Sequence, residues 1–232
     1  MDKLIKLVVL LLLCFNIHAQ SVSTYIPSQA YVHLPRLVTE QQTYWSDHPK
    51  PWLLGSLVEH ESCISLKHSR CWNPQSRLKS AREEGAGLGQ ITRAYRADGT
   101  IRFDALQEIK SKHKPLQELN WNNVYSRPDL QLRAVVLKMQ DNYKYYQKYP
   151  DALAFADAAY NGGIGGLDKE RRACFITSGC DSTRWFGNVE NFCMKSKVAL
   201  YGQRSACDIN RHHVHDVLVT RAPKYKQFFN QP

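Results

Sequence analysis

The sequence predicts a mainly α-helical single domain with little or no β-sheet, held together by disulfides. Its 232 residues are enough for one good core and too few for two full domains. Apolar residues recur at helical spacing in several segments, whereas strand-like alternation is rare. Seven cysteines, one of them in an apolar N-terminal stretch, indicate covalent stapling of an exported chain.

Residues 1–19 have the layout of a secretory signal peptide. Two lysines precede an apolar stretch at 7–15, and polar residues follow it before Ala19. The apolar stretch is too short for a comfortable membrane span. We therefore expect cleavage after Ala19, a periplasmic or secreted protein, and membrane contact only through this transient segment. An uncleaved anchor and lipid attachment at Cys14 are the alternatives.

Six cysteines are left after the signal peptide. An even number in an exported chain predicts three disulfides, with about fifteen possible pairings. Short loops favour sequential pairing, namely Cys63 with Cys71, Cys174 with Cys180, and Cys193 with Cys207. A zinc site that uses the neighbouring His212, His213 and His215 is the alternative, but no two cysteines have the close spacing of zinc ligands.

The chain is basic, with a formal net charge of +10. Outside the cytoplasm such a charge favours an anionic partner, such as the cell wall or lipid head groups. Nucleic acid would be the first candidate for a cytosolic chain, and the signal peptide argues against it.

The predicted elements begin with an extended lead-in at 20–45, which has scattered prolines and no periodicity, ahead of a domain at 46–230. Helix-start residues follow at 46–51, and apolar residues at three-to-four spacing then predict a helix up to Glu61. Glu61 continues its apolar stripe. Glu59 points off that stripe, so we expect it to be an ordinary charge.

Downstream, residues 62–92 are irregular, with glycines at 85, 87 and 89. Further helices are expected at about 103–109, 129–149, 151–161, 188–200 and 208–228.

Three features carry candidate chemistry. A carboxyl on an apolar stripe, such as that of Glu61, is partly desolvated, which favours its protonated form and suits it to proton donation. The glycine-rich loop allows close approach of the backbone to a ligand, and Gln90 adds an amide. Tyr160 and Asn161 offer a phenol and an amide at a helix end. Each feature alone also fits an ordinary helix end or turn.

In order along the chain, these features resemble the motifs of the soluble, lysozyme-like lytic transglycosylases. The matching residues are Glu61-Ser62, Trp72-Asn73-Pro74, Gly87-Leu88-x-Gln90 and Ala159-Tyr160-Asn161. The resemblance covers about residues 50–170. In this chain Gly89 replaces a methionine, Glu84-Gly85 stands where the family has Gly-Ala, and eight extra residues separate the first two motifs. These extra residues lie almost entirely between Cys63 and Cys71, which suggests a disulfide-closed insertion.

The resemblance implies a goose-type-related lysozyme fold and cleavage of the β-1,4 bond between N-acetylmuramic acid and N-acetylglucosamine in peptidoglycan. Glu61 would act as general acid and then as base, and the product would carry a 1,6-anhydro end. Ser62, Gln90, Tyr160 and Asn161 would bind the substrate. The family needs no metal or cofactor. Its exported members open the wall for secretion or conjugation machinery, recycle murein or serve a phage, and the signal peptide favours a bacterial envelope enzyme.

Two other functions are compatible with the sequence. A hydrolytic muramidase would need a second carboxylate, for which Asp98 and Asp104 are the candidates. A non-catalytic wall-binding or assembly protein would need none of the catalytic set. Glu83 and Glu84 are additional acids near the glycine loop, and we expect them to be solvated.

Overall fold

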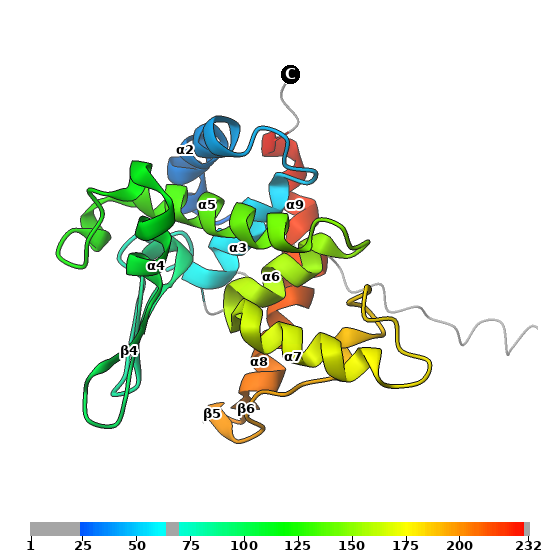
Figure 1. Ribbon diagram of the computed structural model, residues 1–232. Coiled ribbons are helices and arrows are strands. Elements are labelled where there is room, and N and C mark those ends of the chain that lie inside the picture. Colours follow the sequence, from blue (N-terminus) through cyan, green and yellow to red (C-terminus); the bar gives the residue numbers. More distant parts are fainter. Residues whose placement is uncertain (1–23, 64–69, 230–232) are drawn as a thin grey trace, which may run out of the picture.

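The computed structural model describes residues 24–63 and 70–229 (Figure 1). These residues form a mainly helical single domain with small antiparallel sheets and three disulfides. The mainly α-helical class is therefore confirmed. The expected signal peptide at 1–19 lies outside the described residues.

Helix α3 (Trp52–Ser62) lies in the middle of the domain and ends with the Glu-Ser pair. It begins directly after Pro51, whose fixed φ suits a helix start. Its apolar residues Leu54, Leu57 and Val58 are fully buried in the main core. The helix packs against α2, α5, α9 and the segment that precedes α9, so it has neighbours on several sides. The helix predicted to end at Glu61 is confirmed.

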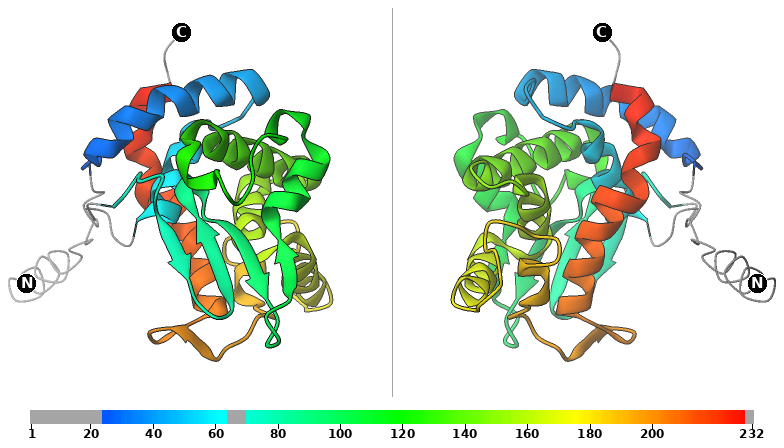
Figure 2. Two further views of the ribbon diagram at one scale, coloured as in Figure 1. Left: turned by 90° about the vertical axis from the view of Figure 1, so that its left-hand side faces the viewer. Right: turned by 90° about the vertical axis from the view of Figure 1, so that its right-hand side faces the viewer.

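The C-terminal helices form one long rod beside α3 (Figure 2). Helix α8 (Ala206–His215) begins with a capping box, in which the Ser205 hydroxyl accepts from the Asp208 N–H and the Asp208 carboxylate accepts from the Ser205 N–H. A π-helical turn at Asp216–Arg221 leads into α9 (Ala222–Phe229). This confirms the helical prediction for 208–228 and brings ionisable side chains of that segment next to α3.

The segment expected as an extended lead-in is instead mostly helical. Helix α2 (Ser28–Tyr44) includes Pro35 and buries Ala30, Leu34, Leu37 and Gln41, which follow one another at three-to-four spacing. Residues at this spacing lie on one face of the helix, and the helix packs on α5. The prediction was wrong because this face includes polar residues such as Gln41, which interrupt the apolar repeat.

A four-stranded antiparallel sheet occupies part of the segment expected to be irregular. Its strands follow the chain in order: β1 (Arg77–Lys79), β2 (Glu83–Ala86), β3 (Ile91–Tyr95) and β4 (Ile101–Asp104). The expectation of little or no sheet understated this element. The strands have three to five residues each and carry several charges. The alternation of apolar and polar residues is therefore too short to indicate a strand.

The remaining helices surround α3 and the sheet. They are α4 (Ala105–Lys112), α5 (Pro128–Tyr146), α6 (Ala152–Gly162) and α7 (Ile164–Phe175). The helices predicted near 103–109, 129–149 and 151–161 are confirmed. The helix predicted at 188–200 is wrong, since this stretch holds only a 3₁₀ turn (Val189–Asn191) and the start of the hairpin β5 (Ala199–Tyr201) and β6 (Arg204–Ser205).

The three disulfides pair in sequence order, as predicted: Cys63–Cys71, Cys174–Cys180 and Cys193–Cys207. They use all six cysteines beyond Cys14, which excludes the alternative of a cysteine–histidine zinc site. Three disulfides are consistent with an oxidising compartment outside the cytoplasm. Across the described residues, no helix combines the length and apolar character that crossing a membrane requires.

Candidate functional site

Glu61 lies at the C-terminal end of α3, and its side chain is 13% exposed. Its Oε1 is 2.9 Å from Nε2 of His213 on α8. The carboxyl is therefore held on one oxygen by the protein and still reaches the surface. This combination is what a group that exchanges protons with a substrate requires.

His213 connects Glu61 to a second carboxylate. Its Nδ1 is 2.8 Å from Oδ2 of Asp157, which lies on α6 and is fully buried. Three helices that are distant in sequence thus contribute a line of carboxylate, imidazole and carboxylate. The His60 ring packs edge-on against the His213 ring, with centroids 4.4 Å apart.

The two carboxylates control the charge of His213. Burial alone would lower the pKa of the imidazole, but the charge and hydrogen bond of Asp157, followed by those of Glu61, outweigh burial and raise the pKa to about 10. Burial raises the pKa of Asp157, against the opposing effect of the His213 charge. The geometry favours a protonated ring at neutral pH, because only the imidazolium can donate from both nitrogens at once.

Ser62 is turned into the protein rather than outward. Its hydroxyl donates to the Val58 carbonyl at 2.6 Å and accepts from the Trp72 N–H at 2.8 Å. Trp72 is fully buried and has a positive φ of 63°, and its indole N–H donates to the Tyr225 hydroxyl. The Glu-Ser and Trp-Asn-Pro motifs are thereby joined, and Cys63–Cys71 closes the same connection covalently. Most of the insertion expected between these cysteines, residues 64–69, lies outside the described residues.

Gln131 of α5 holds the glycine-rich loop in place from the interior of the protein, where its side chain is fully buried. Gln131 Oε1 accepts from the Leu88 N–H at 2.8 Å, and its amide nitrogen donates to the carbonyls of Val124 and Pro74. Gln90 has a left-handed backbone and donates from its side chain to the Gly87 carbonyl at 3.0 Å. The amide proposed for substrate binding is thus partly exposed, next to a loop that buried hydrogen bonds hold in place.

The Gly87→Ala substitution should destabilise the protein strongly. Gly87 has a φ of +72°, and a Cβ there would lie 2.3 Å from the Gln131 amide. We expect a loss of about 2–4 kcal/mol in the free energy of unfolding, from left-handed strain plus overpacking. Gly99→Ala is the matched control, because Gly99 has a φ of +82° but nothing within 4 Å. Urea unfolding measures both, and equal losses would contradict the Gln131 contact.

Tyr160 and Asn161 lie at the end of α6, next to the other motifs. The Tyr160 hydroxyl donates to the Gly89 carbonyl at 2.8 Å, and its ring stacks over the His213 ring with centroids 6.5 Å apart. A Cβ at Gly89 would lie 2.3 Å from Val135 Cγ2 and 2.8 Å from that hydroxyl, which accounts for glycine at this position. Asn161 is exposed, and its Oδ1 accepts from Asn210 Nδ2 at 2.9 Å.

Lys138 of α5 adds a cation to this group. Its Nζ donates to the Tyr160 carbonyl at 3.0 Å and lies 4.0 Å from the centre of the Tyr160 ring. Burial lowers the pKa of Lys138, and the Glu61 charge opposes that effect. Burial also raises the pKa of Tyr160 well above its usual value, with further contributions from the Glu61 and Asp157 charges. Glu61 therefore shares one electrostatic environment with Lys138 and Tyr160.

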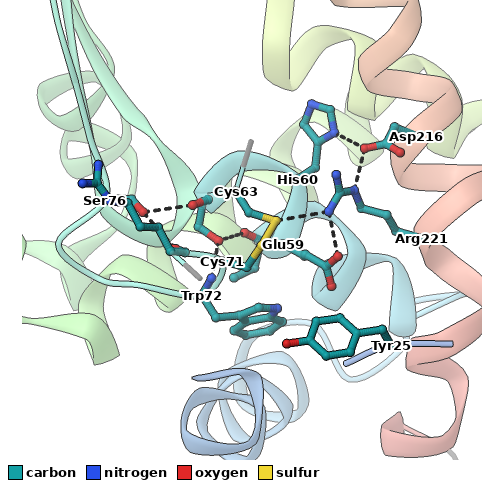
Figure 3. Close-up of a disulfide and its surroundings, with 12 residues drawn as sticks. Tyr25, Glu59, His60, Cys63, Cys71, Trp72, Ser76, Asp216 and Arg221 are labelled. Carbon is teal, nitrogen blue, oxygen red and sulfur yellow. Dashed lines mark hydrogen bonds and ion pairs between the residues drawn. A yellow bond between two sulfur atoms is a disulfide. The ribbon is translucent and has the colours of Figure 1, made fainter. Parts of the chain in front are cut away.

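Glu59 is not the ordinary charge that the sequence suggested. It is fully buried, and its Oε1 accepts from Arg221 and from Lys224, each at 2.7 Å, while Tyr225 donates to its other oxygen. Figure 3 shows Glu59 and Arg221 beside the Cys63–Cys71 disulfide, whose Cys63 sulfur also accepts from Arg221. Glu59 thus anchors the C-terminal rod to α3 and has no access to a substrate.

The other acids considered from the sequence are used elsewhere. Glu84 is buried and paired with Arg77 and Arg93, so the expectation that it is solvated was wrong. Burial would raise the pKa of Glu84, but the hydrogen bonds from Arg93 and Arg77 lower it.

Asp104 caps α4 and accepts a hydrogen bond from the Trp121 indole. The Asp98 side chain accepts a hydrogen bond from Thr100 in the turn between β3 and β4. Glu83 is a partly exposed residue of β2.

A metal ion has one set of possible ligands among residues 24–63 and 70–229. His60, His212 and Asp216 bring ligating atoms within 4.8 Å of one another. Asp216 Oδ2, however, is 2.6 Å from Nδ1 of His60 and 2.5 Å from Nε of Arg221. A cation would have to compete with the guanidinium, so the arrangement fits an ion-pair network better than a metal centre. Figure 3 shows this network running from His60 through Asp216 to Arg221.

A surface pocket of about 590 Å³ lies away from these residues. It is lined by Tyr145, Lys148, Tyr149, Asp168, Arg171, Arg172, Phe175, Ser182 and Thr183. None of them belongs to the motifs, so we place the candidate site at Glu61 on the chemistry of its side chains and not on the size of a pocket.

Sequence reasoning missed His213 as a partner of Glu61, together with Asp157 and Lys138. An acid in the alanine-rich, buried helix α6 was a usable signal, because such a charge needs a partner. The partner of Asp157 is His213, which is 56 residues away in sequence, and no local pattern points to it.

Comparisons of the chain with family models, with characterised proteins and with solved structures found no match.

Proposed function

We propose that the chain is a lytic transglycosylase with a lysozyme-like fold, which cleaves the β-1,4 bond between N-acetylmuramic acid and N-acetylglucosamine. One observation carries this proposal: the motifs, scattered over about 100 residues of sequence, are joined to one another by side-chain contacts, and His213 links them to one partly exposed carboxyl. Ser62 binds the Trp72 backbone, Tyr160 binds the glycine loop, and the His213 ring both stacks on Tyr160 and contacts Glu61.

The reaction needs only one carboxyl. Protonated Glu61 gives its proton to the glycosidic oxygen while the bond from that oxygen to C1 breaks, and the oxygen keeps the electron pair. The Glu61 carboxylate then takes the proton of the muramic acid 6-hydroxyl, whose oxygen bonds to C1. The product carries a 1,6-anhydro end, Glu61 is protonated again, and no water is consumed.

A hydrolytic muramidase is supported less well. A hydrolase of this type uses a second carboxyl across the scissile bond. Both oxygens of Asp104 accept hydrogen bonds within the protein, and Asp98 is exposed in a hairpin turn. Neither arrangement leaves a carboxylate poised to activate water opposite Glu61.

The charge and the disulfides support an envelope location for this activity. The formal charge of +10 suits an anionic wall polymer, and three disulfides suit an oxidising compartment. Peptidoglycan strands are the proposed substrate, and a secretion or conjugation apparatus that needs a local opening in the wall is the proposed class of partner.

Digestion of purified sacculi tests the proposal. The mature, disulfide-bonded protein should release muropeptides with 1,6-anhydro ends, each lighter by one water than the product of hydrolysis, and mass spectrometry distinguishes the two. Reducing ends one water heavier would identify a muramidase instead. Binding to sacculi without any release would favour the wall-binding function.

A further inference from the structure

His213 is a buried ionisable residue that the proposed reaction does not use. Its side chain is 1% exposed, that of Asp157 is fully buried, and that of Glu61 is 13% exposed. The line of three groups therefore begins in the core on α6 and reaches the surface only at Glu61. Burying such groups is costly, and Oδ1 of Asp157 has no hydrogen-bond partner among the described residues.

Stability alone is a poor reason for this arrangement. Replacing buried ion pairs by apolar residues is often neutral or stabilising, so a protein gains little by keeping one in its core. A plain helix contact between α3, α6 and α8 would not need a charge at Glu61, which is the least buried of the three. The geometry instead resembles a support for a working carboxyl: a buried acid orients the imidazole, and the imidazole orients the exposed acid.

We propose that His213, held by Asp157, is a positioning residue for Glu61. The inference rests on the proposed function. The Nε2–H of His213 donates to Glu61 Oε1 and fixes the carboxyl, which leaves Oε2 for the oxygen atoms of the substrate. The Asp157 carboxyl, bonded to Nδ1, sets which way the ring faces.

This hydrogen bond acts in both halves of the reaction. When Glu61 gives up its proton, the carboxylate that forms accepts a charge-assisted bond from the protonated ring, and such bonds are about twice as strong as neutral ones. An interaction that strengthens as the reaction proceeds raises kcat rather than substrate affinity. In the second half, the same bond keeps Oε2 in place to accept the proton of the 6-hydroxyl. Support from His213 thus helps a single carboxyl to serve as acid and then as base.

Two amide variants separate positioning from structure. In His213→Gln, the amide nitrogen can take the place of Nε2 and still donate to Glu61. In His213→Asn, the shorter amide can take the place of Nδ1 and contact Asp157, but it cannot reach Glu61. Both variants remove the ring and its charge. They differ in which carboxyl loses its partner, Asp157 in His213→Gln and Glu61 in His213→Asn, so the melting temperature of each variant is measured beside its activity.

Steady-state release of anhydromuropeptides from soluble glycan strands is the readout. We expect His213→Asn to lower kcat about 100-fold with KM changed less than threefold, and His213→Gln to stay within about tenfold of the unmodified protein. Equal kcat values for the two variants, or losses that follow their melting temperatures, would overturn the positioning role.

NMR of the unmodified protein supplies a test that does not depend on the variants folding. Long-range proton–nitrogen spectra of the imidazole should show a proton on Nε2 of His213 at neutral pH. A bare Nε2 would overturn the inference. Failure of the proposed function looks different, since the unmodified protein would then release no anhydro product at all.

Discussion

Glu61→Gln should reduce the release of anhydromuropeptides from sacculi to background. Glutamine has nearly the shape of glutamate and can still accept the His213 hydrogen bond through its amide oxygen, so the site should keep its geometry. It cannot give up or take a proton, and loss of general acid–base catalysis costs roughly 10²–10⁴-fold in rate. Turbidity clearing of sacculi, with mass spectrometry of the soluble products, measures the loss.

A surface variant and a binding assay test whether the loss of clearing is specific to the Glu61 carboxyl. Glu108→Gln removes an exposed acid that forms an ion pair with Lys112 on α4, and it should clear sacculi at the normal rate. Cosedimentation with sacculi should be unchanged in Glu61→Gln, because the substitution removes none of the lysines and arginines that make the chain basic. Unchanged clearing by Glu61→Gln would refute the assignment of Glu61 as the catalytic acid, because cleavage would then depend on another residue.

The parts of the fold that the sequence predicted correctly are those with a local signal. The helices α5 and α6 have strong apolar repeats bounded by proline, aspartate or glycine, and the disulfides follow from short loops between consecutive cysteines. The sheet escaped prediction because its register depends on contacts between strands. Helix α2 escaped because its stripe contains polar residues, of which Gln41 is buried with its side chain bonded to the Trp45 carbonyl.

The site shows a different limit of local reasoning. The apolar stripe of α3 suggested that Glu61 faces the core and Glu59 faces solvent, and the structure has Glu59 as the more buried of the two. A stripe predicts exposure only for a helix with a solvent face. Helix α3 is covered on several sides, so the environment of each acid depends on which distant helix lies against it. The rod of α8 and α9 supplies Arg221 and Lys224 to Glu59, and His213 to Glu61.

Glu59→Gln should cause a large loss of stability, in contrast to the loss of activity expected for Glu61→Gln. The substitution removes the carboxylate that Arg221 and Lys224 share, and both cations are at most 4% exposed. Removing one partner of a buried ion pair typically costs about 3–5 kcal/mol, because the other charge is left without compensation. Urea unfolding with the disulfides intact should show this loss as a lower midpoint.

Lys224 should bear most of this cost, and a double-mutant cycle can show it. Arg221 keeps its ion pair with Asp216 at 2.5 Å when Glu59 is neutralised, whereas the hydrogen-bond acceptor that Lys224 keeps among the described residues is the uncharged Tyr25 carbonyl. Burial lowers the pKa of Lys224 and the Glu59 charge opposes that effect, so the ammonium is disfavoured once the carboxylate is gone. Glu59→Gln combined with Lys224→Met should therefore be less destabilised than the sum of the single variants, by about 1–3 kcal/mol. Strictly additive losses would contradict the shared carboxylate and would assign the cost to Arg221 or to packing.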